Sequence, residues 1–456
     1  FKNKNYKKAT DFINQADLLA QNNNLLALNN LICEKQAQIF FDQNIYDKAR
    51  FYYEKIAKYY NSEEDSYNYL NTRLKIALTL LSENNYAKSE QVLNETIKNL
   101  YKNQTPKDFI ISEDLTYIDL YCKANIYLAS VHFLQATQQD NLILFMQSYK
   151  EINNLQSFMD NNRYLFIHDS QSDSEKNNFI NVYKLKMDIA VTIYNKTQDN
   201  RYLETAFEMS EKARSQSFIN EAGSQLISKL SNPKLKNNQK TEIAFLDNKN
   251  NYALETADGL ERGIKIISSG PQSNAIKSNE LSNLQRKYDD LINSLKDDKS
   301  IQLVDVNILS LNSVQNTLYN DEILLNYYVS GNNCYLFVIT KNQYSLFTIE
   351  KNYHEISNII DSYRSQLMLT NNNDYLANSK TLYDILIKPA EQDIINKKII
   401  IIPSGKLNNL PFSSLSDGNK FLIEKNQISE LPNISILQFI NLKTKKAPKT
   451  ELLALG

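Results

Sequence analysis

The sequence predicts two architectures in one chain: an α-solenoid of helical hairpins over residues 1–223 and an α/β domain over residues 301–456. A linker and a connecting helix over residues 224–300 are predicted to join them. Three observations lead to this prediction: the first of the eight glycines is Gly223, a 40-residue repeat runs through the region before it, and short segments typical of strands begin at Ile323. Glycine and proline disfavour helix interiors, so a long stretch almost free of both favours helices.

The repeat is carried by Tyr6, Tyr46 and Tyr86, which lie 40 residues apart. A lysine follows each tyrosine after two positions, and a small residue follows after three. A fixed period in this range indicates stacked helical hairpins, each of which buries its apolar side against the next. The small residues would let neighbouring helices approach closely.

The Tyr-x-Lys-Ala start of each second helix resembles tetratricopeptide (TPR) repeats. The 12-residue spacing from Ala37 to Ala49 and from Ala77 to Ser89 is similar to that family as well. HEAT-like repeats fit the longer period better but lack this signature, so TPR-like repeats are the preferred interpretation. Further hairpins are predicted at Leu115–Gln138 with Leu142–Met159, and at Phe179–Asn195 with Tyr202–Ala222.

After Gly223 the pattern changes. Ser224–Asn279 is polar and interrupted by glycine and proline, which predicts a linker. Leu281–Leu295 carries apolar residues at helical spacing and predicts an amphipathic connecting helix.

The α/β domain opens with a predicted antiparallel meander of three short runs rich in β-branched and aromatic residues, Ile323–Val329, Cys334–Thr340 and Tyr344–Glu350. Two helices are predicted next, at about Tyr353–Leu369 and Asn378–Asn396. The four isoleucines Ile399–Ile402 predict a strand buried on both faces. The remaining predicted elements are extended pieces at Phe421–Lys425 and Gln427–Ser429, a helix at Asn433–Leu442 and a buried strand that begins at Glu451.

Several of these segments resemble the CHAT family of caspase-like cysteine proteases. The run Ile399–Leu415, an apolar strand followed by Pro-Ser-Gly and then Leu-Pro-Phe, resembles its strongest early motif. The resemblance covers about Ser313–Gly456, and Ala206–Ser215 resembles the last repeat found just before CHAT domains. Further segments resemble the family in the same order: Asp321–Tyr328, Leu382–Pro389, Phe421–Glu424, Leu431–Ile434 and Leu452–Gly456.

The resemblance implies a cysteine thiolate nucleophile and a histidine general base or acid, on loops after later strands. Because both ends of the chain, Phe1 and Gly456, are interpreted as cut, we expect this pair beyond the chain and assign no catalytic residue within it. Cys334 begins a predicted strand, which is the wrong context for the nucleophile. None of the three histidines, His132, His168 and His354, follows a strand and precedes a glycine.

Composition argues against several classes of function. The net charge is -1, from 51 basic and 52 acidic residues, so no overall field favours nucleic acid or an anionic membrane. The sequence contains no run of 18 apolar residues, so no membrane-spanning helix is predicted. The three cysteines form no Cys-x-x-Cys pair, which argues against a disulfide framework and a cysteine zinc site. No phosphate loop, dinucleotide fingerprint or His-Glu-x-x-His motif is present, so neither a cofactor nor a metal ion is predicted.

The sequence therefore predicts a TPR-regulated, caspase-like cysteine endopeptidase that cleaves a protein substrate and takes a partner protein or peptide in the TPR groove. The alternatives are a non-enzymatic TPR scaffold with a degenerate CHAT-like domain, and an adaptor that binds another protease. The expected location is the cytoplasm, and secretion stays open because the N-terminus is interpreted as missing.

Overall fold

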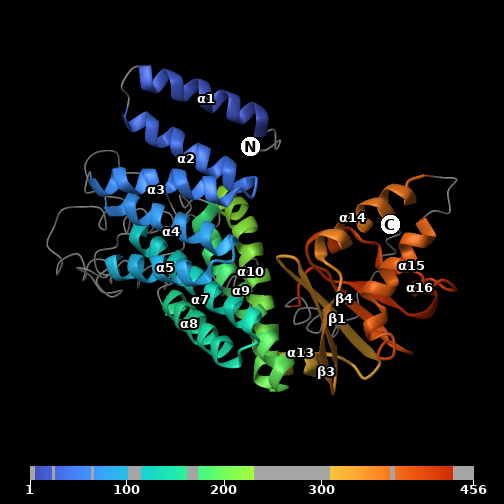
Figure 1. Ribbon diagram of the computed structural model, residues 1–456. Coiled ribbons are helices and arrows are strands. Elements are labelled where there is room, and N and C mark those ends of the chain that lie inside the picture. The colour runs from blue at the N-terminus through green and yellow to red at the C-terminus, as the bar shows by residue number, and fades with distance from the viewer. Residues whose placement is uncertain are drawn as a thin grey trace, which may run out of the picture. The chain divides into compact units, whose positions relative to one another are not determined.

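The computed structural model describes residues 6–22, 26–62, 66–100, 115–161, 173–230, 309–369 and 375–434 (Figure 1). Its contacts divide the chain into two compact units. The first consists of Phe1–Lys196 with Ala222–Gln302, and the second of Thr197–Glu221 with Leu303–Gly456. The predicted connecting helix at Leu281–Leu295 lies outside the described residues.

The described part of the first unit is made of consecutive packed helices (Figure 1). Each helix packs against the next described helix along the chain from α1 to α8, and α4 also contacts α7. The bounds are α1 Tyr6–Asn22, α2 Leu26–Asp42, α3 Tyr46–Ser62, α4 Ser66–Ser82, α5 Tyr86–Leu100, α7 Leu115–Gln139, α8 Leu142–Asn161 and α9 Asp173–Thr197. Among the described residues, no helix combines the length and the apolar character that crossing a bilayer requires.

The 40-residue sequence repeat is a structural repeat. Helices α1, α3 and α5 begin at Tyr6, Tyr46 and Tyr86, as the repeat predicts. The turn before Tyr46 contains Asn44 in the left-handed conformation (φ 61°), and the turn before Tyr86 contains Asn84 in the same conformation (φ 59°). Each tyrosine hydroxyl donates to the side-chain oxygen of its asparagine, at 2.7 Å and 2.9 Å. Asparagine tolerates this backbone conformation better than most residues.

The small residues of the repeat lie where helices cross. Ala37, Ala49, Ala77 and Ser89 are almost completely buried. Close approach lets the Ser89 hydroxyl donate to the carbonyl oxygen of Ala77 at 2.8 Å. Helices α7 and α8, which occupy the next predicted hairpin, are held by an equivalent bond of 2.7 Å from Ser148 to the Ala129 carbonyl oxygen.

The second unit is built on a mixed five-stranded sheet with the order β3-β2-β1-β4-β5. Strands β1, β2 and β3 form the predicted antiparallel meander, and β4 and β5 add in parallel. The strands are β1 Glu322–Ser330, β2 Asn333–Thr340, β3 Tyr344–Ile349, β4 Lys398–Ile402 and β5 Ile428–Glu430. The main helices are α10 Asn200–Leu230, which belongs to this unit as far as Glu221, α13 Leu311–Thr317, α14 Tyr353–Leu367, α15 Tyr375–Leu386 and α16 Leu422–Lys425.

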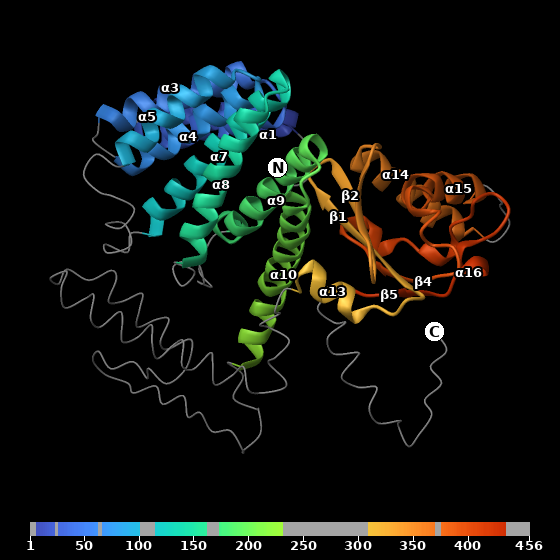
Figure 2. The same ribbon diagram turned by 90° about the horizontal axis from the view of Figure 1, so that it is seen from below.

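Helices cover both faces of this sheet (Figure 2). Alternate residues of the central strands, such as Leu325 and Ile401, form one core with Ile360 of α14 and Leu386 of α15. The opposite face packs against α10, where Phe207 makes an edge-on ring contact with Phe337 of β2 at 5.6 Å. Coverage on both faces explains why the isoleucines of β4 form an unbroken apolar run.

Two local predictions were wrong. The segment Phe421–Lys425 was predicted to be extended, but Leu422–Lys425 forms the short helix α16, whose first turn is closed when the Phe421 N–H donates to the Glu424 carboxylate at 2.6 Å. Helix α15 was predicted to reach Asn396 but ends at Leu386, and Pro389 lies in a separate 3-10 turn. The predicted helix beyond Ile434 and the strand from Glu451 lie outside the described residues.

The contacts group Thr197–Glu221, which is most of α10, with the sheet, whereas Ala222–Gln302 groups with the first unit. The domain boundary at residue 223 stays a prediction. We expect fragments 1–196 and 197–456 each to fold alone, because each keeps its own core. Fragment 224–456 should instead bind a dye for exposed apolar surface, because the α10 face of the sheet is uncovered. Circular dichroism, thermal melting and dye fluorescence check this.

The control for that experiment is fragment 1–223, which carries α10 as far as Gly223 but lacks the sheet. Fragment 1–223 should melt at the same temperature as fragment 1–196. The helix that its additional residues form should be only weakly protected from hydrogen exchange. A random-coil spectrum for fragment 1–196, or a native-like, dye-free fragment 224–456, would contradict this assignment of α10.

Candidate functional site

The carboxyl ends of the parallel strands are the first place to look for a site in this unit, because ligands of open α/β sheets bind in crevices there. Strand β4 ends opposite the middle of β1, where Ile402 pairs with Asn326. Strand β5 ends at Glu430. Three features lie around these strand ends: the turn after β4, a buried polar cluster and an open depression.

The turn after β4 is held by its own backbone geometry. Gly405 has φ 59°, a conformation that glycine adopts without strain. The next backbone N–H, of Lys406, donates to the Tyr353 hydroxyl at 2.6 Å, and the Lys406 ammonium pairs with Asp361 of α14. Pro-Ser-Gly in the sequence predicted the turn, but not that the start of α14 packs on it.

The buried polar cluster centres on Asn326, a fully buried residue in the middle of β1. Its side-chain oxygen accepts from Arg214 at 2.8 Å, and its amide donates to Glu211 at 2.9 Å. Both partners are on α10. This cluster was not predicted, although the sequence offers a signal for it: a single asparagine inside an otherwise apolar and aromatic strand.

An open depression of about 460 Å³ lies beside the ends of β4 and β5. Burial raises the pKa of Glu430 at its edge, despite a hydrogen bond from the Phe412 backbone N–H. The residues that line the depression include neither a cysteine nor a histidine. Its lining is Arg364, Leu367, Met368, Asn408, Asn409, Leu410, Pro411 and Glu430.

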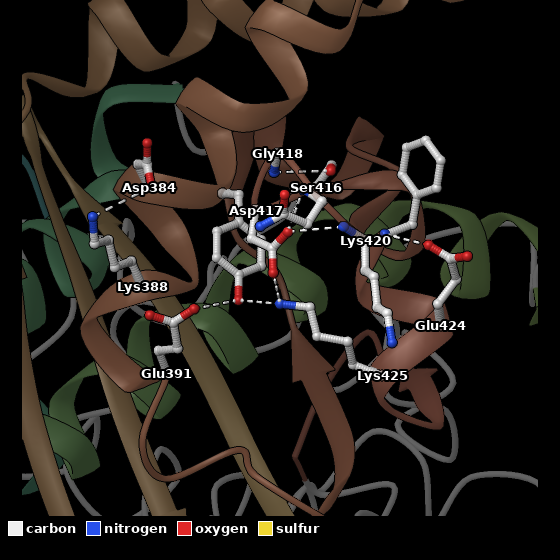
Figure 3. A network of polar contacts seen from close by, with 12 residues as sticks. Asp384, Lys388, Glu391, Ser416, Asp417, Gly418, Lys420, Glu424 and Lys425 are labelled. Carbon is white, nitrogen blue, oxygen red and sulfur yellow. Dashed lines mark hydrogen bonds and ion pairs between the residues drawn. The ribbon is translucent and has the colours of Figure 1, made fainter.

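A second polar network joins the loop after the 3-10 turns to α15 and the turn that follows it (Figure 3). Asp417 accepts from the backbone N–H groups of Asn419 and Lys420 and pairs with Lys425, and these bonds hold its pKa well below the usual range. The Tyr383 hydroxyl accepts from Lys425 at 3.1 Å and donates to Glu391 at 2.9 Å. With these partners the network fastens a loop and leaves no activated group.

The cysteines and histidines do not come together in the described residues. Cys334 is completely buried in β2, and burial raises its pKa to about 12, so at neutral pH it is a thiol rather than the thiolate that attacks a carbonyl. Cys33 and Cys122 are buried in the first unit. His354 is exposed at the start of α14, and His168 lies outside the described residues. Among the described residues, no group of three or more metal-binding side chains is placed to hold a metal ion.

His132 is buried in the helical array between two carboxylates. Its Nδ1 lies 2.7 Å from Glu151 of α8, and its Nε2 lies 3.4 Å from Glu90 of α5. Burial alone would lower the pKa of this imidazole, but the hydrogen bonds and charges of the two glutamates outweigh it and raise the pKa. The imidazole therefore ties three helices together, most strongly when it is protonated.

Residues 376–456 match the CHAT domain family. The match begins at the start of α15 and includes β4, the turn after it, α16 and β5. It thus overlaps the region of the predicted resemblance, which was expected to begin at about Ser313. No curated protein matches the chain.

The CHAT match supports a relation of this region to a caspase-like, protease-type family, and the helical region before it is consistent with repeats. Strand β1 lies before the matched residues but is hydrogen-bonded to β4 along five residue pairs, so it belongs to the same sheet. The buried cluster at Asn326 therefore lies next to the CHAT-matching strands.

The packing of Tyr353 on the turn after β4 can be tested by comparing substitutions at two glycines, Gly331 and Gly405, that share the left-handed conformation. Gly331→Ala should destabilise the protein by roughly 1–2 kcal/mol, the general cost of a left-handed residue, because no atom lies within 4 Å of the added Cβ. Gly405→Ala should cost roughly 2–4 kcal/mol, because its Cβ would overlap the Tyr353 hydroxyl and displace the bond to Lys406. Urea unfolding of the whole chain measures both, and equal losses would contradict the packing of Tyr353 on the turn.

The His132 cluster predicts a pH dependence of stability. A raised pKa in the folded state contributes stability that is fully present below the unfolded-state value of about 6.5 and is lost as the pH rises through the folded-state value. His132→Gln should therefore destabilise the first unit more at about pH 6 than at about pH 9, as measured by thermal melting.

The control for His132 removes its partners. In a Glu90→Gln, Glu151→Gln background, the His132→Gln loss should no longer be larger at the lower pH, since no carboxylate favours the protonated imidazole. A loss that is equal at both pH values in the native background would show that His132 acts only as a packed side chain.

Proposed function

We propose that this chain contains the partner-binding array and a region of the protease domain of a caspase-like cysteine endopeptidase that cleaves a protein substrate. The observation that carries the proposal is the match of residues 376–456 to the CHAT domain family, downstream of a helical array. None of the described cysteines and histidines is proposed as a catalytic residue.

The order of elements supports this assignment. An apolar strand, β4, is followed by the Pro403–Gly405 turn, then by Leu-Pro-Phe at Leu410–Phe412, and then by a further parallel strand, β5. This is the order that the CHAT resemblance implies. The TPR-like interpretation of the array is supported by the matched tyrosine-asparagine turns and by the small residues buried between helices.

The array is proposed to bind a partner protein or peptide. Stacked helical hairpins present extended surfaces suited to a peptide or a helix. The described helices of the first unit also carry exposed large apolar side chains, which a protein partner could cover. The most exposed of these are Phe12, Leu18, Leu19, Phe51 and Ile143.

Cysteine-directed peptide probes test the enzymatic part of the proposal. Residues 1–456 alone should hydrolyse no peptide or protein and should resist labelling, because Cys334 is buried and protonated. The polypeptide encoded by the whole gene should cleave a protein substrate. Replacing the cysteine that follows its later strand should lower the cleavage rate at least about 1,000-fold, the scale expected for loss of a nucleophile.

The control variant is Cys334→Ala. In the whole polypeptide it should leave cleavage unchanged apart from a stability loss. If it abolishes activity, the nucleophile has been misplaced. If the whole polypeptide cleaves nothing, with or without a protein captured by the array, the alternative of a non-enzymatic scaffold replaces the proposal.

A further inference from the structure

Helix α10 crosses the sheet, and over residues 204–214 nearly every helical turn contributes one side chain that contacts a strand or a strand end. Glu204, Phe207, Glu211 and Arg214 lie three or four residues apart, so they share one side of the helix. Their partners follow the order of the strands: Tyr344 of β3, Phe337 of β2, Asn326 of β1, and then the end of β4. The contacts of α10 with Asn326 of β1 and with Pro403 at the end of β4 are polar.

Arg214 makes the contacts that join two strands. One guanidinium nitrogen donates to the Pro403 carbonyl oxygen at 2.7 Å, immediately after β4. The other donates at 2.8 Å both to the Asn326 side chain and to the Tyr327 carbonyl oxygen, in β1. The guanidinium also lies over the Tyr328 ring, 5.9 Å from its centre. A planar fork can reach these acceptors together, whereas a lysine ammonium is a single point charge.

The charge of Arg214 is balanced inside the same cluster. Glu211 is 1% exposed, and its carboxylate lies 3.4 Å from the Arg214 Nε. Asn326 closes a triangle, since it accepts from the arginine and donates to the glutamate. A buried charge without a partner is strongly destabilising, so the three side chains hold one another in a single arrangement.

The Pro403 carbonyl opens the turn that follows β4. Next in that turn, the Ser404 hydroxyl accepts from the Val329 N–H at 3.3 Å, and the Lys406 N–H donates to Tyr353 at the start of α14. The Tyr353 N–H in turn donates to the Asn332 carbonyl oxygen at 2.9 Å, between β1 and β2. Among the described residues, Arg214 is therefore the only partner of this turn named above that lies outside the region 303–456.

We propose that Arg214 is a positioning residue: with Glu211 and Asn326 it sets the conformation of the Pro403–Lys406 turn at the carboxyl edge of the CHAT-matching sheet. Only Gln198 and Asp199 separate α10 from α9, the last helix of the array before it, so the turn is set by a helix that continues directly from the array. This role is independent of whether the whole protein is a protease.

Hydrogen–deuterium exchange on the whole chain tests this role. In Arg214→Lys, exchange in peptides that cover residues 403–412 should rise about tenfold or more, because lysine keeps the charge but cannot bridge both strands. Exchange in α14 and α15 away from the turn, and in helices α3 to α8, should change by less than about twofold. Arg201→Lys is the matched control, because Arg201 is on the same helix, pairs with Asp199 and is exposed.

Glu211→Gln provides a second variant that keeps an acceptor for Asn326 but removes the counter-charge. It should produce the same local increase around residues 403–412, smaller than that of Arg214→Lys. An increase spread evenly over the sheet and its helices would show that Arg214 only stabilises the fold. No increase around the turn, or the same increase in Arg201→Lys, would also overturn the proposal.

Discussion

The central strands of the second unit cannot leave either face in water. Leu324, Leu325, Ile401 and Ile402 are completely buried, so apolar side chains point to both sides of the sheet. Each such side chain is worth roughly 1.5–3 kcal/mol when it is moved out of water. Helices α14 and α15 supply cover on one side, and α10 supplies it on the other. The rest of the unit depends on this coverage, and it explains why α10 groups with a sheet that lies about a hundred residues later in the chain.

The polar centre of the α10 contact follows from the same constraint. A helix packed on a uniformly apolar sheet could slide or rotate with little penalty. Asn326 is hydrogen-bonded to both Glu211 and Arg214, which also form an ion pair with each other, and this arrangement fits only one register. Burying these groups adds little net stability over apolar residues of the same shape, because desolvation offsets the attraction. What the cluster supplies is a defined position for the helix relative to the ends of β1 and β4.

Much of the fold could be predicted from local signals, and less of the candidate site could. The starts of α1, α3 and α5, the meander and the buried strand β4 all follow from repeats, periodicity and turn residues that act over a few positions. Helix α16 was missed because a short amphipathic run does not distinguish a helix from a strand, and the Glu424 cap decides it. The depression beside β5 and the Tyr353 contact could not be foreseen, since they join segments that are distant in the chain.

The sequence by itself determined most of the helices and strands apart from α16 and the end of α15, where the repeats turn, and that the C-terminal region resembles a CHAT domain. Those properties depend on backbone preference and on apolar spacing, which are written into neighbouring residues. Only the tertiary structure decided that α10 covers one face of the sheet, and that Asn326 is satisfied by two residues more than a hundred positions earlier. The physical reason is that burial and pairing of polar groups are properties of three-dimensional neighbours, which the order of residues along the chain does not specify locally.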